Sequence, residues 1–135
     1  METTAPNVER DALRAWGVSI AQATCGAYFF VAGVLALNSA PEVVRGFARW
    51  GWPDEARVAV GLFELVASVL IVVPRFARRA AITLGAMMVA SMLVRVAKLE
   101  LFPGLIEGIL LVPLLILVAN AHRPARAVEV AIVPA

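Results

Sequence analysis

Three charged side chains interrupt the apolar stretches of this chain, and their types suit acid–base chemistry. Glu64 stands inside GLFELVASVL, Arg95 inside SMLVRVA and Glu107 inside GLIEGILL. Burial raises the pKa of a carboxyl group, whereas a neighbouring guanidinium lowers it. Two glutamates beside one arginine can therefore hold different protonation states at one pH. We therefore predict that Glu64, Glu107 and Arg95 are the catalytic residues if the protein catalyses a reaction.

The composition around these residues is that of a membrane protein. Of the 135 residues, 61% are hydrophobic and 16% are charged, and the mean hydropathy is +0.86, which exceeds what a soluble domain can bury. The twelve Lys and Arg residues stand at the ends of apolar runs, where they meet lipid headgroups, so we expect no nucleic-acid partner. The single cysteine, Cys25, and the single histidine, His122, exclude an intrachain disulfide and a bis-histidine haem, and we expect no metal site.

Charges and prolines divide the chain into four apolar segments, each close to the roughly 20 residues that cross a bilayer. The segments run from about residue 16 to 37, from 57 to 73, from just after Arg79 to 97, and from 101 or 103 to 121. The sequence therefore predicts an all-α fold, a bundle of four transmembrane helices over residues 16–121. A polar N-terminal segment, 1–15, precedes it, and a C-terminal tail, 122–135, follows it.

The stretch between the first two segments has a different character. NSAPEVVRGFARWGWPDEA is too polar to cross a membrane, but its apolar residues recur at helical spacing. It predicts a short amphipathic helix in the headgroup layer, with Trp50 and Trp52 as interface anchors.

The distribution of Lys and Arg predicts the orientation of the bundle. Seven of them lie in the two termini and the connection between the second and third segments, against five on the other side. The positive-inside rule then places both termini in the cytoplasm and the Trp-rich helix outside, in a cell membrane that the chain crosses several times.

Helical rise predicts that the three intramembrane charges meet. At about 1.5 Å per residue, Glu64 lies near the bilayer midplane, while Arg95 and Glu107 reach about the same height under the outer surface. Because isolated charges in hydrocarbon cost roughly 2.5 to 3.5 kcal/mol each, we expect Arg95 beside Glu64 and Glu107 inside the bundle. The alternatives are a purely structural ion pair at Glu64, an Arg95 that reaches the headgroups, and a Glu107 at the interface.

Further polar and aromatic residues are candidates for binding a ligand. They lie on the predicted inward stripes, at helix ends or in the Trp-rich turn, and they are Gln22, Tyr28, Asn38, Trp50, Trp52, Ser68, Ser91 and Lys98. Gln22 shares a helix face with Gly26 and Gly33, whereas Tyr28 lies on another face. The glycines predict close helix contacts, through which a homodimer or a membrane partner protein is also possible.

The run from Tyr28 to about Pro124 resembles the DoxX-like family of small four-helix membrane proteins. The likeness rests on FFVAGVLAL at 29–37, WGWP at 50–53, GLFELVASVLIVVPR at 61–75 and RRAAITLGAMM at 78–88. The resemblance implies a four-helix bundle in a bacterial cytoplasmic membrane, with links to quinone or thiol redox chemistry and, in animal relatives, to receptor assembly. Many relatives carry a basic residue late in the first helix, where this chain has Ala36.

Three functional hypotheses follow. In the first, a pocket in the outer half of the bundle binds an apolar small molecule, with or without acid–base catalysis such as isomerisation, ring opening or cyclisation. No cofactor is needed for that chemistry, and no nucleophile with an adjacent base is visible. In the second, the pocket holds a quinone for a redox partner; in the third, the protein assists membrane-protein assembly and has no small-molecule site.

Overall fold

The computed structural model describes residues 5–100 and 104–123, and within them every regular element is a helix. Its five helices are α1 (Ala5–Leu37), α2 (Pro41–Trp50), α3 (Asp54–Leu70), α4 (Pro74–Ala97) and α5 (Gly104–Ala121). The prediction of an all-α fold is confirmed. The predicted short helix after the first apolar segment is also present, as α2.

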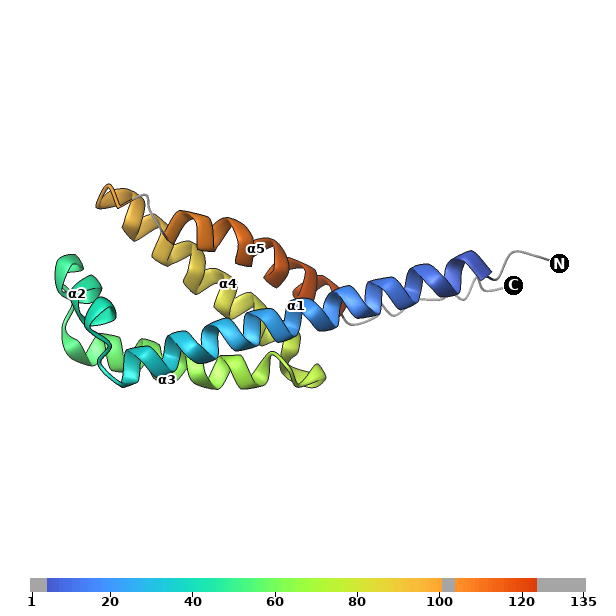
Figure 1. The fold of residues 1–135 in the computed structure, drawn as a ribbon, viewed down its shortest axis with the longest axis horizontal. Helices are drawn as coiled ribbons and strands as arrows, with labels where there is room; N and C mark the ends of the chain where they lie inside the picture. Colours follow the sequence, from blue (N-terminus) through green and yellow to red (C-terminus); the bar gives the residue numbers. More distant parts are fainter. Residues whose placement is uncertain (1–4, 101–103, 124–135) are drawn as a thin grey trace, which may run out of the picture.

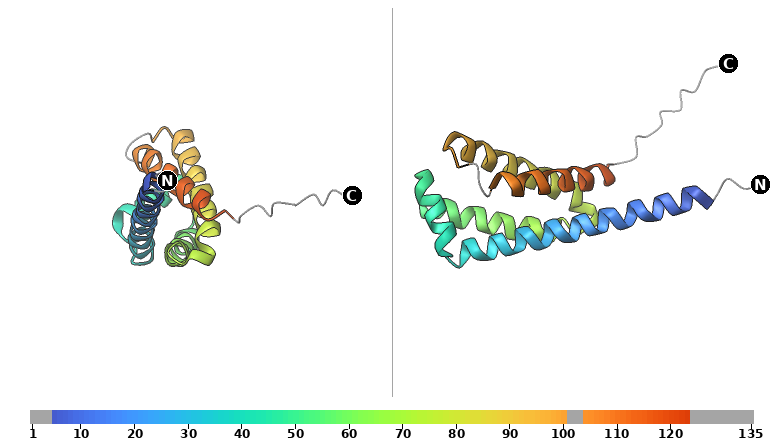
Figure 2. Two further views of the ribbon diagram at one scale, coloured as in Figure 1. Left: turned by 90° about the vertical axis from the view of Figure 1, so that its right-hand side faces the viewer. Right: turned by 45° about the horizontal axis from the view of Figure 1, so that its top comes forward.

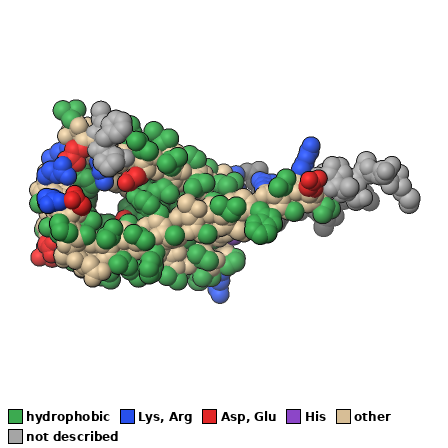
Figure 3. All heavy atoms as spheres, viewed as in Figure 1, with side chains coloured by type: hydrophobic (Ala, Val, Ile, Leu, Met, Phe, Trp, Pro, Cys, Tyr) green, Lys and Arg blue, Asp and Glu red, His purple; other side chains and the backbone are tan. Residues whose placement is uncertain are grey.

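Among the described residues, three helices are long and apolar enough to cross a membrane: Val8–Leu37 within α1, Pro74–Ala97 and Gly104–Ala121. The second predicted apolar segment, 57–73, forms α3 (Asp54–Leu70), which is shorter, with 17 residues. Large hydrophobic side chains cover much of the outer surface of these helices, as expected of a protein surrounded by lipid (Figure 3).

The helix boundaries differ from the predicted ones at several points. α1 begins at Ala5, so residues 5–15 of the predicted polar segment continue the first apolar helix without a break. α4 begins at Pro74, which places Arg78 and Arg79 inside the helix rather than before it. Proline suits the first turn of a helix because the N–H that it lacks has no helical partner there. The start of the fourth predicted segment, at 101–103, and the tail from residue 124 lie outside the described residues.

The four long helices form two antiparallel pairs, α1 with α3 and α4 with α5, and α2 connects α1 to α3 (Figure 1). The pairs meet through contacts of α1 with α5 and of α3 with α4, and the N-terminal part of α1 extends beyond the other helices (Figures 1 and 2). The core between the pairs contains fully buried side chains from α1, α4 and α5 and from the residue that follows α3: Cys25, Phe29, Leu84, Leu115, Val118 and Ile71.

Glycine residues hold α1 against α3. A Cβ atom at Gly33 would lie 2.8 Å from the Gly61 carbonyl oxygen, and one at Gly61 would lie 2.8 Å from the Ala36 Cβ atom. A Cβ atom at Gly26 would lie 3.3 Å from the Ser68 carbonyl oxygen. The glycines therefore form the contact seam that their helical spacing predicted. The seam lies within one chain and is not available to a second copy.

We expect Gly33→Ala to destabilise the bundle by about 1 to 3 kcal/mol, because the new methyl group must push α1 away from the α3 backbone. Gly17→Ala is the matched control, since nothing lies within 4 Å of a Cβ atom there, and a helical Gly→Ala change is neutral or stabilising by up to about 1 kcal/mol. Thermal unfolding of both variants in detergent measures the difference. Equal unfolding temperatures would contradict the seam.

Candidate functional site

The two helix pairs are joined by a hydrogen bond between side chains of α1 and α5. The Tyr28 hydroxyl of α1 donates to the Glu107 carboxylate of α5 over 2.9 Å, and both side chains are half-buried. Tyr28 occupies a different face of α1 from Gly26 and Gly33, which contact α3. α1 can therefore pack on α3 with one face and present a phenol to α5 with another.

Glu64 of α3 and Arg95 of α4 lie close enough for their charges, like that of Glu107, to act on the Tyr28 hydroxyl. Both are half-buried. All four long helices thus contribute one polar side chain to this region. Within the described parts of the chain, however, no ion pair joins Arg95 to either glutamate, and Glu64 has no hydrogen-bond partner.

Arg95 instead packs between α2 and the start of α5. Its guanidinium carbon lies 5.3 Å from the centre of the Trp50 ring, a distance typical of a cation–π contact. Its side chain also covers Gly104, the first residue of α5, where any Cβ atom would collide with it. The absence of a side chain at Gly104 therefore provides the space that Arg95 occupies.

Glu100, in the connection from α4 to α5, joins this group and was not among the predicted site residues. Its carboxylate accepts a hydrogen bond from Trp50 Nε1 over 3.1 Å and lies 3.5 Å from an Arg49 nitrogen. Leu99 just before it has a left-handed backbone, with a φ of 60°, which ends α4 and turns the chain toward α2. The role of Glu100 depends on contacts with residues that are far away in the sequence. Nothing in the sequence near Glu100 predicts these contacts.

We expect Glu100→Ala to loosen α2 from the rest of the molecule with little change in global stability, because Arg49 is exposed and such pairs contribute about 1 kcal/mol or less. Faster hydrogen exchange of the α2 amides is the expected result. Glu42→Ala, which removes only the exposed pair with Arg45 inside α2, is the control. Unchanged exchange in Glu100→Ala would show that Glu100 does not anchor α2.

A second arginine, Arg57, joins α1 to α3 at their connected ends. Its side chain is only 4% exposed, and it binds the Asp54 carboxylate in a bidentate manner, over 2.7 and 2.9 Å. It also donates to the Ala36 carbonyl in the last turn of α1. Ala36 is the position at which the expected basic residue is absent, and Arg57 from the next long helix brings a guanidinium to it.

The remaining predicted binding residues have varied surroundings. Gln22 donates from Nε2 to the Ile71 carbonyl at the end of α3 over 2.8 Å, and Ser68 donates to the Leu65 carbonyl of its own helix over 2.7 Å. Trp52 packs edge-on against Trp50 and Phe47. Ser91 is half-buried on α4, while Asn38 and Lys98 are exposed at the ends of α1 and α4. Of the predicted residues, the structure joins Tyr28 to Glu107 and places Arg95 over the Trp50 ring. Gln22 and Asn38 have other surroundings.

The molecule is hollowed near the end that carries α2. Figure 3 shows an opening there, with acidic and basic side chains at its rim. Two residues lie at this end: Trp50, the last residue of α2, and Arg95, in the last turn of α4. Among the described residues, no group of three His, Cys, Asp or Glu side chains is placed to hold a metal ion.

Comparison with protein families agrees with this architecture. The family model of the DoxX-like family matches residues 20–122, a range that contains α2 to α5, the greater part of α1 and every residue of the site. Searches of curated proteins and of solved structures found no match. Since the match covers most of the chain, this small membrane protein belongs to the DoxX-like family.

Proposed function

We propose that the protein binds an apolar small molecule between its two helix pairs, with the polar end of that molecule at Tyr28, Glu64, Glu107 and Arg95. The observation that carries the proposal is the Tyr28–Glu107 hydrogen bond from α1 to α5, close to two further charged side chains from α3 and α4. An apolar site with a few convergent polar groups is the usual form of a small-molecule pocket. In this proposal the molecule would enter through the opening at the α2 end (Figure 3).

The proposal includes four membrane-spanning helices. With 17 residues, α3 is about 25 Å long and lies at the lower limit for a transmembrane helix. Its close packing along α1 supports a transmembrane position. In this arrangement α2 lies in the interface: it has no buried residue and carries charged side chains beside the Phe47, Trp50 and Trp52 cluster. The orientation with both termini in the cytoplasm remains part of the proposal.

Acid–base catalysis is the chemistry that these residues support. The Glu107 carboxylate already accepts a hydrogen bond from the Tyr28 hydroxyl. This bond fixes its orientation, so Glu107 suits the role of a base. Glu64 has no hydrogen-bond partner among the described residues, so it is available to a ligand as an acid or base. Arg95 would stabilise negative charge that develops on the substrate. Isomerisation, ring opening or cyclisation of a lipid-like substrate requires no more than these groups.

The test is to purify the full-length protein in mild detergent and identify the small molecules that it retains by mass spectrometry. A retained apolar molecule that is lost from Glu64→Gln, with the fold intact, is the expected result. Glu55→Gln is the matched control, because Glu55 is exposed in the first turn of the same helix. Equal retention by wild type, Glu64→Gln and Glu107→Gln would contradict the proposed site.

A quinone is the second candidate ligand, because the Arg95 guanidinium carries hydrogen-bond donors of the kind that quinone carbonyl groups accept. The protein would then serve a redox partner rather than catalyse a reaction. A redox-active absorbance in the extracted molecule identifies this case. A role in membrane-protein assembly predicts instead that no small molecule is retained and that Glu64→Gln has no effect.

A further inference from the structure

The side of α1 that faces away from the bundle carries an apolar stripe with the spacing of a helix–helix seam. The opposite side of α1 is buried through Val18, Ala21, Cys25 and Phe29. On the outer side, six exposed residues follow one another at alternating intervals of three and four. They form the α1 stripe: Leu13, Trp16, Ile20, Ala23, Ala27 and Phe30. This seven-residue pattern is the one by which two parallel helices pack along each other.

The stripe combines large side chains with small neighbours. Trp16, Leu13 and Ile20 are 70%, 67% and 61% exposed, so they make little contact with their own chain. Ala12, Gly17, Ser19 and Thr24 flank the stripe. Small flanking residues allow two helix backbones to approach, which is how helices associate where lipid provides no hydrophobic driving force.

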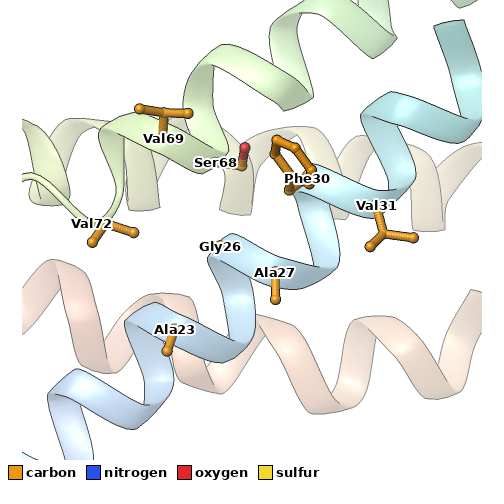
Figure 4. A pocket seen from close by; sticks show the side chains of 8 residues that line it. All are labelled: Ala23, Gly26, Ala27, Phe30, Val31, Ser68, Val69 and Val72. Carbon is orange, nitrogen blue, oxygen red and sulfur yellow. The ribbon is translucent and has the colours of Figure 1, made fainter.

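A shallow groove lies on the same stripe. It is bounded on α1 by Ala23, Gly26, Ala27, Phe30 and Val31, and on the other side by Ser68 and Val69 of α3 and by Val72 just after it. Its volume is about 410 Å³. Figure 4 shows Ala23 and Ala27 pointing to the same side of α1. The short side chains leave the hollow, so a partner helix can approach most closely at this level.

The length of α1 indicates what covers the stripe. Its 33 residues correspond to about 50 Å, against about 30 Å of hydrocarbon, and its N-terminal part extends beyond the bundle (Figures 1 and 2). Lipid covers Ala27 and Phe30, but acyl chains do not reach along the whole projecting part, where Leu13 begins the stripe. A single partner can cover the entire stripe only if it is also a long helix. That helix must cross the membrane beside α1 and extend beyond the hydrocarbon at the same end.

α1 of a second copy meets this requirement. Two copies with the same orientation in one bilayer place their α1 helices parallel, with the same residues at the same depth. We propose that the protein forms a parallel homodimer through the Leu13 to Phe30 stripe of α1.

Cysteine cross-linking in membranes tests this dimer. The only native cysteine, Cys25, is buried on the bundle side of α1, and Cys25→Ala provides a cysteine-free full-length protein. In that protein, Ala27→Cys is expected to give a disulfide-linked dimer on mild oxidation, because equivalent positions of a parallel seam lie within the usual Cα separation of a disulfide. Leu110→Cys, exposed on α5, is the control and is expected to cross-link far less.

A second measurement leaves the small residues of the stripe unchanged. Donor and acceptor dyes on Leu110→Cys in dilute proteoliposomes are expected to show energy transfer, and Trp16→Glu is expected to abolish it. Because Trp16 is exposed, this substitution leaves the fold intact. Cross-linking that is equal at positions 27 and 110, a cross-linked product containing a different protein, or energy transfer that persists in Trp16→Glu would each overturn the proposal.

Discussion

Arg57→Met is expected to lower the unfolding temperature of the protein in detergent by roughly 5 to 10 °C. Methionine fills a similar volume, so the loss reports hydrogen bonding rather than packing. The change removes both bonds to the Asp54 carboxylate and the donor that reaches the Ala36 carbonyl. It therefore separates the end of α1 from the start of α3.

The chain contains a well-matched control for this result. Arg45 pairs with Glu42 at the same spacing as Arg57 with Asp54, but both side chains of the Arg45 pair are exposed. Exposed pairs contribute little to stability, so Arg45→Met is expected to leave the unfolding temperature nearly unchanged. Similar losses in the two variants would show that burial of Arg57 has no special role.

The Arg57–Asp54 pair also predicts how the stability of the fold responds to acid. Asp54 stands at the first position of α3, outside its apolar run, and its hydrogen bonds with Arg57 hold the pKa of this carboxyl below the ordinary value of 3.8. A carboxyl group whose pKa is lower in the folded state stabilises the fold fully above its unfolded pKa. We therefore expect this contribution to persist at neutral pH and to be lost only as the pH falls below 3.8. In Asp54→Asn that part of the pH dependence should be absent.

The sequence predicted the helices better than their ends. Apolar runs of about 20 residues and the amphipathic stretch around Trp50 specify helices directly, because hydropathy and helical spacing are local properties. The helical state of residues 5–15 was missed, since polar residues of mixed charge carry no membrane signal although they permit a helix. The arginines at the start of α4 were read as a loop for the same reason.

The site shows where reading a single sequence stops. Helical spacing placed Tyr28 and Gln22 on different faces of α1, and the structure directs Tyr28 to Glu107 and Gln22 to the end of α3. Depth estimates gave heights along the membrane normal, but they contain no information on rotation about a helix axis. Arg95 was therefore expected beside the glutamates, whereas its nearest described contacts are Trp50 and Gly104. The roles of Glu100 and Arg57 depend on contacts between separate helices, for which the chain has no local pattern.

Glu107→Gln is expected to reduce the turnover of a substrate identified by the retention experiment by about 100-fold or more, if Glu107 is the base, because general base catalysis contributes about 10² to 10⁴. Glutamine keeps the size of the side chain and can still accept a hydrogen bond from Tyr28. The fold should therefore be retained, and the unfolding temperature of the variant confirms that it is.

Tyr28→Phe completes the comparison, because it removes the partner of Glu107 without changing the ring. If Tyr28 orients the Glu107 carboxylate, the double variant should be no worse than Glu107→Gln alone, since residues that act as a unit are not additive. Losses that multiply in the double variant would assign Tyr28 a separate contact with the substrate. Full activity in Glu107→Gln would instead leave Glu64 as the sole candidate base. If the Tyr28–Glu107 pair is purely structural, Tyr28→Phe should lower the unfolding temperature without affecting ligand retention by the folded protein.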